Sequence, residues 1–320
     1  MSIRERWLPI CLAGAFVRLM ALASQLTGCD EILFPETAAI LCGAWVQPHQ
    51  AWNVDRPRMM LLMGSGAIMG LCLNLLVPGP IWARAVLGYA CCALAMNGLG
   101  ADMTPMVSAV ILPVLLGTRD WAYPVTVIVL VGVICLGQMA LERWGLRERI
   151  DFKPLRPPAR QALHDWGARL GVFALLSAPA YFSGNPLLAA PPLLVTYTEF
   201  TRPDMTLRLK PRRAWGTLAL AGLFGGVGRF AVESLGVPPT LVVALFYPLL
   251  IATWSTFETW LPPAGAALLL GLLVPYAGPL AYPASVAVGG AVWVTAAMAF
   301  PGIRPKAIER GPLPARGHSC

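Results

Sequence analysis

The segment AYPVTVIVLVGVICLGQMAL, residues 122–141, contains no charged residue. A second uncharged segment, AYPASVAVGGAVWVTAAMAF at residues 281–300, begins with the same Ala-Tyr-Pro sequence. An α-helix needs about 20 consecutive apolar residues to cross the hydrocarbon core of a bilayer. Each segment therefore predicts a transmembrane helix, and the shared opening indicates two related halves of the chain.

The composition extends this prediction to the whole chain. Of its 320 residues, 57% are hydrophobic and 12% are charged, against roughly 25% charged in an ordinary globular domain. Prolines and charged residues separate about twelve apolar segments. We therefore expect an all-α, polytopic membrane bundle with segments near residues 7–27, 32–47, 59–78, 81–100, 104–117, 122–141, 167–184, 186–200, 213–231, 237–257, 261–276 and 279–300.

The second, fifth, eighth and eleventh segments are shorter than a full membrane span. We expect these helices to be short or broken. They either cross with little tilt, stop part-way, or enter and leave on the same side.

The basic residues predict the orientation. If every segment crosses, 19 of the 24 Lys and Arg residues lie on the side of the N-terminus, and the other five lie in or between the segments. Positive loops mark the cytoplasm, so we expect a multi-pass protein of the cell (inner or plasma) membrane with both termini cytoplasmic. This pattern explains the net charge of +8 without nucleic acid as a partner, and it makes the lipid bilayer a partner.

Prolines, glycines and charged loops follow the same order in the two halves of the chain, which predicts an internal repeat. We expect a first six-segment repeat at residues 1–141, a basic cytoplasmic linker at 142–165, a second repeat at 166–303 and a cytoplasmic tail at 304–320. Six is an even number, so the two repeats are parallel, and a binding site is expected at their interface. The alternative is that unrelated apolar segments resemble each other through composition alone.

Metal and cofactor chemistry have little support in the sequence. The eight cysteines form no CxxC motif, and the three histidines, His49, His164 and His318, fall in loops or the tail. No segment contains the histidine that serine or zinc proteolysis would need. We therefore expect no metal, no cofactor and no enzyme activity.

The openings of segments five and eleven predict the substrate site. Proline at a first helical position costs no hydrogen bond, and Thr104 can cap the helix. A helix N-terminus presents unpaired N–H groups and partial positive charge, which favour an anion. Tight helix packing is the alternative use of the same small residues. The expected substrate-binding residues are Thr104, Pro105, Ser108, Pro262, Pro263, Ala264 and Gly265.

Charged residues within the apolar segments predict coupling or gating, because such groups are expensive in hydrocarbon. The candidates are Glu36, Asp102, Glu258 and Arg18. For Glu36 we favour a helix N-terminal charge at the outer interface over a proton-coupling role. Glu199 is expected to pair with Arg202 at an interface.

The run Leu261–Leu269, LPPAGAALL, resembles the signature of the HPP family of integral membrane proteins, which is named for a His-Pro-Pro motif leading into Ala-Gly. The match covers Pro262, Pro263, Ala264, Gly265 and Ala266, whereas Leu261 replaces the histidine. HPP proteins are associated with nitrite or nitrate transport, so the resemblance implies anion passage. A vaguer likeness to fusaric-acid and aromatic-acid exporter membrane domains implies efflux of organic anions.

Together these features favour a secondary transporter or channel for a small anion, such as nitrite, nitrate or an organic carboxylate, with its site between the two repeats. A lipid-processing intramembrane enzyme that uses buried carboxylates is one alternative. A membrane scaffold subunit without transport activity is another. The small anionic solute is the expected partner, and a homo-oligomer is compatible with the sequence.

Overall fold

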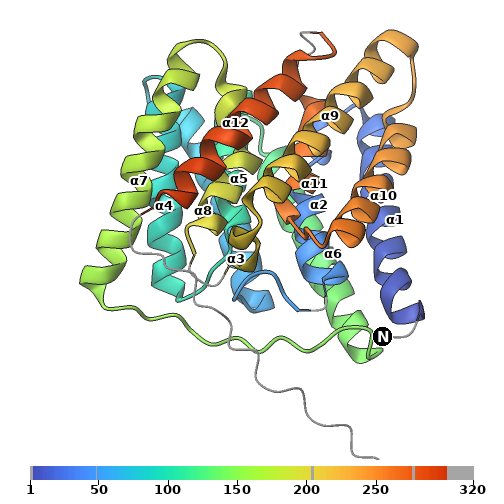
Figure 1. The fold of residues 1–320 in the computed structure, drawn as a ribbon, viewed down its shortest axis with the longest axis horizontal. Helices are drawn as coiled ribbons and strands as arrows, with labels where there is room; N and C mark the ends of the chain where they lie inside the picture. Colours follow the sequence, from blue (N-terminus) through green and yellow to red (C-terminus); the bar gives the residue numbers. More distant parts are fainter. Residues whose placement is uncertain (1–2, 48, 203–204, 276–277, 301–320) are drawn as a thin grey trace, which may run out of the picture.

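The computed structural model describes residues 3–47, 49–202, 205–275 and 278–300. These residues contain twelve α-helices and no strand (Figure 1). Each of the twelve apolar segments corresponds to one helix, so the predicted all-α class and the number of segments are confirmed.

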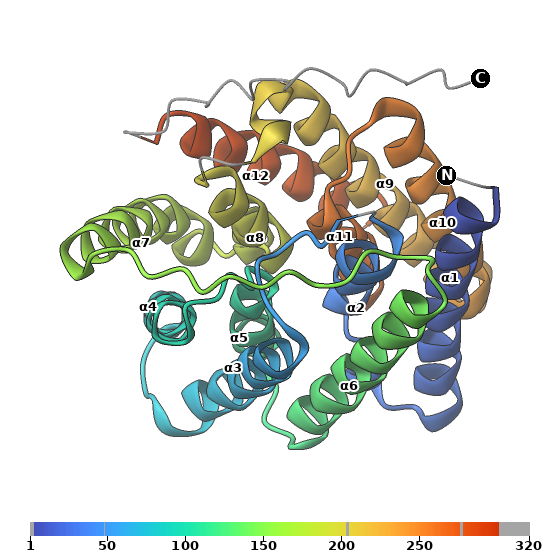
Figure 2. The ribbon, with the colours of Figure 1, turned by 90° about the horizontal axis from the view of Figure 1, so that it is seen from below.

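Six helices in the described part of the chain are long and apolar enough to cross a membrane. They are α1 (Ile3–Thr27), α3 (Arg56–Leu76), α6 (Ala122–Arg143), α9 (Pro211–Leu235), α10 (Pro239–Phe257) and α12 (Ala281–Met298). Two further long helices are α4 (Ile81–Leu99) and α7 (Ala159–Phe182). In the view of Figure 2 these eight helices surround the remaining four.

The four inner helices are short. They are α2 (Glu36–Leu41), which continues into a π-helical turn at Cys42–Val46, α5 (Pro105–Leu116), α8 (Pro191–Phe200) and α11 (Pro262–Leu273). Twelve residues rise only about 18 Å, well short of a bilayer core of about 30 Å. The predicted short segments are thus confirmed, and they form the centre of the fold.

Burial explains why the inner helices are apolar on every side. All residues of α2 and α8 are buried, and so are nearly all residues of α5 and α11. A helix enclosed by other helices has no face that needs water. Proline at the first helical position starts α5, α8 and α11, where its missing N–H breaks no hydrogen bond.

Helix contacts among α1–α6 have counterparts among α7–α12. Helix α3 packs on α5 and α6, as α9 packs on α11 and α12. Helix α1 packs on α10, as α7 packs on α4. The inner helices exchange partners in the same manner, because α2 packs on α11 and α8 packs on α5.

Glycines permit the closest of these crossings. A Cβ atom added to Gly70 on α3 would lie 2.4 Å from the carbonyl oxygen of Val110 on α5. One added to Gly225 on α9 would lie 2.7 Å from the carbonyl oxygen of Leu268 on α11. Each glycine thus lets a long helix touch the backbone of an inner helix.

The segment between α6 and α7, residues 144–158, crosses one end of the bundle (Figure 2). The Asn53 amide donates to the Lys153 carbonyl at 2.7 Å, and the Leu155 N–H donates to the Gly100 carbonyl at 2.7 Å. The Arg58 guanidinium lies over the Phe152 ring, 4.4 Å from its centroid. We call this end of the bundle the linker side.

Candidate functional site

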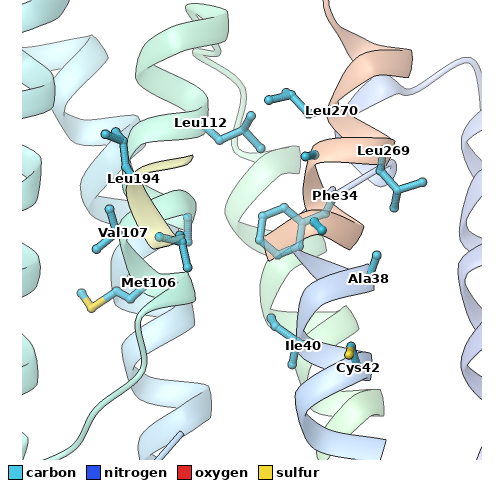
Figure 3. Close-up of a cluster of buried hydrophobic side chains, with 14 of the residues drawn as sticks. Phe34, Ala38, Ile40, Cys42, Met106, Val107, Leu112, Leu194, Leu269 and Leu270 are labelled. Atoms are coloured by element: carbon cyan, nitrogen blue, oxygen red, sulfur yellow. The ribbon is translucent and has the colours of Figure 1, made fainter. Parts of the chain in front are cut away.

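The inner helices meet at a closed apolar seam, which we define by Phe34, Leu112, Leu194, Leu269 and Leu270 (Figure 3). The helices α5 and α8 supply Leu112 and Leu194, while Leu269 and Leu270 come from α11. Phe34 precedes α2. All five side chains are buried, so the seam is inaccessible to solvent in this structure.

A buried carboxyl group lies beside α5. Glu36 occupies the first turn of α2, and 1% of its surface is exposed. The Ser108 hydroxyl of α5 donates to Glu36 Oε1. The second oxygen, Oε2, is buried without a hydrogen-bond partner among the described residues. Glu36 is therefore at a helix N-terminus as predicted, but it is enclosed by helices rather than exposed at an outer interface.

Two tyrosines hold the outer helices to α5 and α11 near this carboxyl group. The Tyr123 hydroxyl of α6 donates to the Ala109 carbonyl of α5 at 2.9 Å, and the Tyr282 hydroxyl of α12 donates to the Ala267 carbonyl of α11. Both hydroxyls lie within electrostatic reach of Glu36. Because these two tyrosines belong to the Ala-Tyr-Pro openings, the shared sequence has a matching structural role.

A second buried carboxyl group lies one turn away along α5. The Thr104 hydroxyl and the Trp52 indole N–H each donate to Glu199 Oε1 at 2.8 Å. Glu199 ends α8 with 3% of its surface exposed, and its Oε2 has no partner among the described residues. Thr104 therefore does not cap α5 through its side chain as expected. Glu199 is enclosed by protein, with Thr104 and Trp52 as its hydrogen-bond donors.

Thr104 and Ser108 are four residues apart, so their side chains share one face of α5. This face contacts one carboxyl group from α2 and another from α8. Negative groups are favoured near a helix N-terminus. The protein's own carboxyl groups thus occupy the positions beside the opening of α5 where the sequence predicted a bound anion.

Sequence reasoning included Glu36 but left Glu199 out of the site. The available signal was an acidic residue at the end of an otherwise uncharged short segment. Its neighbour Arg202 suggested an ion pair instead. In the structure Arg202 forms an ion pair with Asp102 at 2.5 Å. This pair brings Asp102, a predicted coupling residue, close to the carboxyl cluster, which we define as Glu36, Glu199, Thr104 and Ser108.

The opening of α11 differs from that of α5. Its predicted site residues Pro262, Pro263, Ala264 and Gly265 are all buried. A Cβ atom added to Gly265 would lie 3.2 Å from the Ala38 Cβ of α2. Gly265 therefore takes part in tight helix packing, the alternative that the sequence left open.

Two other predicted coupling residues lie away from the cluster. The Glu258 side chain at the end of α10 is 78% exposed, and it accepts a 3.4 Å contact from the Lys210 ammonium group. Arg18 lies on the exposed face of α1. The structure therefore brings together Glu36, Thr104, Ser108 and, through Arg202, Asp102, but neither Glu258 nor Arg18.

Cavities approach the cluster from both ends of the bundle. On the linker side, a cavity of about 820 Å³ reaches Thr104 and Thr198 and is lined by Asp102 and Arg202. At the opposite end, a cavity of about 270 Å³ reaches Phe34 and Tyr123 and has acidic residues at positions 30 and 31. Thr104, which contacts Glu199, lines the linker-side cavity, and Phe34 of the seam lines the cavity at the opposite end.

Arginines stabilise the linker-side ends of α2 and α8. Arg147 donates to the carbonyl groups of Gly43 and Gln47 at 3.2 and 3.0 Å. Arg208 donates to the Phe200 carbonyl, and Arg169 to the Thr201 carbonyl at 3.2 Å. Cations favour helix C-termini. Burial lowers the pKa of Arg147 to about 10, which still leaves its guanidinium charged at neutral pH.

No family model, curated protein or solved structure matches this chain. The resemblance to the HPP family in Leu261–Leu269 therefore stays a prediction.

Proposed function

We propose that this chain is a secondary transporter for a small anion, built from two parallel repeats in the cell membrane. In this proposal α1–α6 and α7–α12 are the repeats, and the solute passes along the seam between the inner helices. The chain acts as a carrier and performs no chemical reaction on its solute.

The repeat proposal is supported by matched contacts. The Tyr89 hydroxyl of α4 bonds to the Thr198 hydroxyl of α8 at 2.9 Å, and the Tyr247 hydroxyl of α10 donates to the Ala38 carbonyl of α2 at 3.1 Å. Each tyrosine thus joins an outer helix of one half to an inner helix of the other half. The pairs Tyr123 and Tyr282, and Gly70 and Gly225, are likewise matched.

The membrane proposal is supported by the exposed surface. Large apolar side chains point outward from the long helices, including Leu94 of α4, Leu136 of α6 and Leu175 of α7, which are 73%, 61% and 74% exposed. An apolar outer surface on helices of this length is suited to lipid. The basic linker side would face the cytoplasm together with both termini.

Reporter fusions test this topology. A fluorescent protein that folds only in the cytoplasm, fused after the last residue, should fluoresce, whereas a periplasmic phosphatase fused there should be inactive. The phosphatase should become active when it is inserted after Gly79 or Gly236, in the loops that end α3 and α9. The opposite activity pattern would reverse the proposed orientation.

The observation that carries the transport proposal is the pair of cavities at the two ends of the bundle, with the buried seam between them. Phe34 lines the cavity at the far end and also packs in the seam, while Thr104 lines the linker-side cavity and contacts the seam helix α8. In transporters built from repeats the solute site lies near the bilayer midplane between the repeats, and the seam occupies the corresponding place between the two cavities. Rocking of one half against the other would open the seam to either cavity.

The linker-side cavity favours an anion on entry. Its lining includes four basic side chains, those of Lys153, Arg156, Arg169 and Arg202, and three acidic ones, those of Asp102, Asp151 and Asp165. The excess of basic groups would attract a small anion to this mouth. Nitrite, nitrate and small organic carboxylates fit this charge. The resemblance to the HPP family implies nitrite or nitrate, and the vaguer likeness to aromatic-acid exporter domains implies organic carboxylates.

Uptake by purified protein in liposomes tests the proposal. Labelled nitrite, nitrate, chloride and benzoate are the probes, and at least one should enter faster than into protein-free liposomes. Phe34→Ala removes bulk from the seam and should raise the passive flux of the same anion. Phe182→Ala is the matched control, because the Phe182 side chain is 66% exposed and lies outside the seam.

Absence of flux with every anion from wild-type protein that remains monodisperse would overturn the transport proposal. Equal changes in Phe34→Ala and Phe182→Ala would show that the flux does not follow the seam. Leu112→Ala provides a second seam variant if Phe34→Ala does not fold, because a buried Phe-to-Ala change costs about 3–5 kcal/mol.

A further inference from the structure

Glu36 and Glu199 are the two carboxyl groups enclosed at the centre of the described fold, and their neighbours leave each with an unfilled oxygen. Oε1 of each accepts hydrogen bonds from neutral donors, Ser108 for Glu36, and Thr104 and Trp52 for Glu199. Oε2 of each is buried and has no partner among the described residues. Buried polar atoms are nearly always satisfied, so each of these two oxygens is free to accept a proton or a hydrogen bond.

Among the residues that the structure describes, the groups around Glu36 supply no positive charge. Helix α5 presents Ser108, α6 presents Tyr123 and α12 presents Tyr282, while the residues of α11 that meet α2 are apolar. The Thr37 hydroxyl, on the next residue of α2, is also buried without a partner. Because a buried carboxylate without a counter-charge is strongly disfavoured, a proton is the simplest ligand for Glu36.

Glu199 lies in a mixed electrostatic environment. Arg202 and Asp102 are its nearest charged neighbours, and they form an ion pair with each other, while Cys42 of the π-helical turn also lies within electrostatic range. The attraction of Arg202 is thus offset by the repulsion of Asp102. The two hydrogen-bond donors on Oε1 leave Oε2 as the atom that can accept a proton.

A neighbour of each carboxyl group lines a cavity. Thr104, which bonds to Glu199, lines the linker-side cavity. Tyr123, which lies near Glu36, lines the cavity at the far end together with Phe34. Since Thr104 and Ser108 lie one turn apart on α5, the two groups are separated by a single helical turn.

We propose that Glu36 and Glu199 are a pair of proton-binding sites that couple anion transport to proton transport. This inference rests on the proposed function. A proton from the linker-side cavity forms an O–H bond at Oε2 of Glu199 and neutralises that carboxylate. Transfer to Oε2 of Glu36 breaks this bond and forms a second O–H bond, and release to the far cavity breaks the second bond. With both groups neutral, an anion passes the face of α5 without charge repulsion; with either group ionised, it is repelled.

The proton sites can be measured without transport. Infrared difference spectra of purified protein in lipid nanodiscs, titrated from acidic to alkaline pH, should contain C=O stretching bands of protonated carboxyl groups. Glu36→Gln and Glu199→Gln should each remove part of that signal. Glu233→Gln is the matched control, because Glu233 is partly exposed and paired with Arg229 at 2.8 Å. This substitution should leave the C=O bands of the two buried carboxyl groups unchanged.

Coupling is measured separately in liposomes. An acidic exterior should accelerate anion uptake by wild-type protein and by Glu233→Gln. Glu36→Gln and Glu199→Gln should each reduce this acceleration by about tenfold or more, because each substitution removes a site that must exchange a proton. If either variant fails to fold, Glu36→Asp and Glu199→Asp retain the carboxyl group and should shift the pH at which uptake accelerates.

The outcomes separate this inference from the transport proposal. Infrared bands that disappear in the two Gln variants, without anion flux in any protein, would support the proton sites and overturn the anion proposal. Anion flux that ignores the pH gradient, with bands unchanged in both variants, would overturn the proton sites and leave transport standing. Loss of the bands together with loss of acceleration supports both.

Discussion

The Thr104 hydroxyl donates a 2.8 Å hydrogen bond to Oε1 of Glu199, a residue 95 positions later in the chain. This bond joins the opening of α5 in the first half to the end of α8 in the second half. It also joins a residue that lines the linker-side cavity to a carboxyl group that is nearly inaccessible to water. The contact therefore links the packing of the two halves to the proposed proton site.

Thr104→Val keeps the shape of the side chain and removes the donor. Glu199 then retains only the Trp52 hydrogen bond, and we expect a loss of stability of about 1–3 kcal/mol. Thermal unfolding in detergent measures the change. Thr104→Ser keeps the hydroxyl and serves as the control, and equal stability of the Val variant and the wild type would contradict the role of this bond.

The glycine crossings give a second prediction. Gly70→Ala and Gly225→Ala place a Cβ atom 2.4 Å and 2.7 Å from carbonyl oxygens of α5 and α11, so each should destabilise the fold by about 1–3 kcal/mol through overpacking. Gly216→Ala, on the same helix as Gly225, meets no atom within 4 Å. Because alanine is the better helix former by about 1 kcal/mol, that control should be neutral or stabilising in the same unfolding assay.

The exchanged tyrosine contacts give a third prediction. Tyr89→Phe and Tyr247→Phe each remove one buried hydrogen bond between the halves, so each should lower stability by about 1 kcal/mol. Tyr181→Phe is the matched control, because the Tyr181 hydroxyl is buried without a partner among the described residues. A similar melting temperature for all three variants would argue that these bonds do not hold the halves together.

Glu258→Gln tests a predicted coupling residue that lies away from the carboxyl cluster in the structure. The Glu258 carboxylate is 78% exposed, and its contact with Lys210 is at the surface. Exposed ion pairs contribute about 0–1 kcal/mol. We expect unchanged anion uptake and unchanged pH dependence in liposomes. If the acceleration by acidic pH falls as much as in Glu36→Gln, Glu258 takes part in coupling after all.

The two proline-opened segments, α5 and α11, have a predictable length but unpredictable surroundings. Both form short helices as predicted, since Pro105 and Pro262 start them and their apolar length is limited. Their surroundings differ, however. The opening of α5 carries two hydroxyl groups and meets carboxyl groups, whereas the opening of α11 carries small apolar residues and packs on Ala38.

The amino-acid sequence by itself determined the all-helical class, the twelve segments and the four short ones, because hydrophobic length, proline and charge act locally along the chain. Only the tertiary structure decided which polar groups meet. Glu199, Trp52 and Thr104 are far apart in sequence, and so are Glu36 and Ser108. The Glu199 contacts join the two halves because α8 packs on α5, whereas Glu36 and Ser108 meet where α2 packs on α5 within the first half. Both arrangements depend on the packing of many buried side chains together rather than on any single segment.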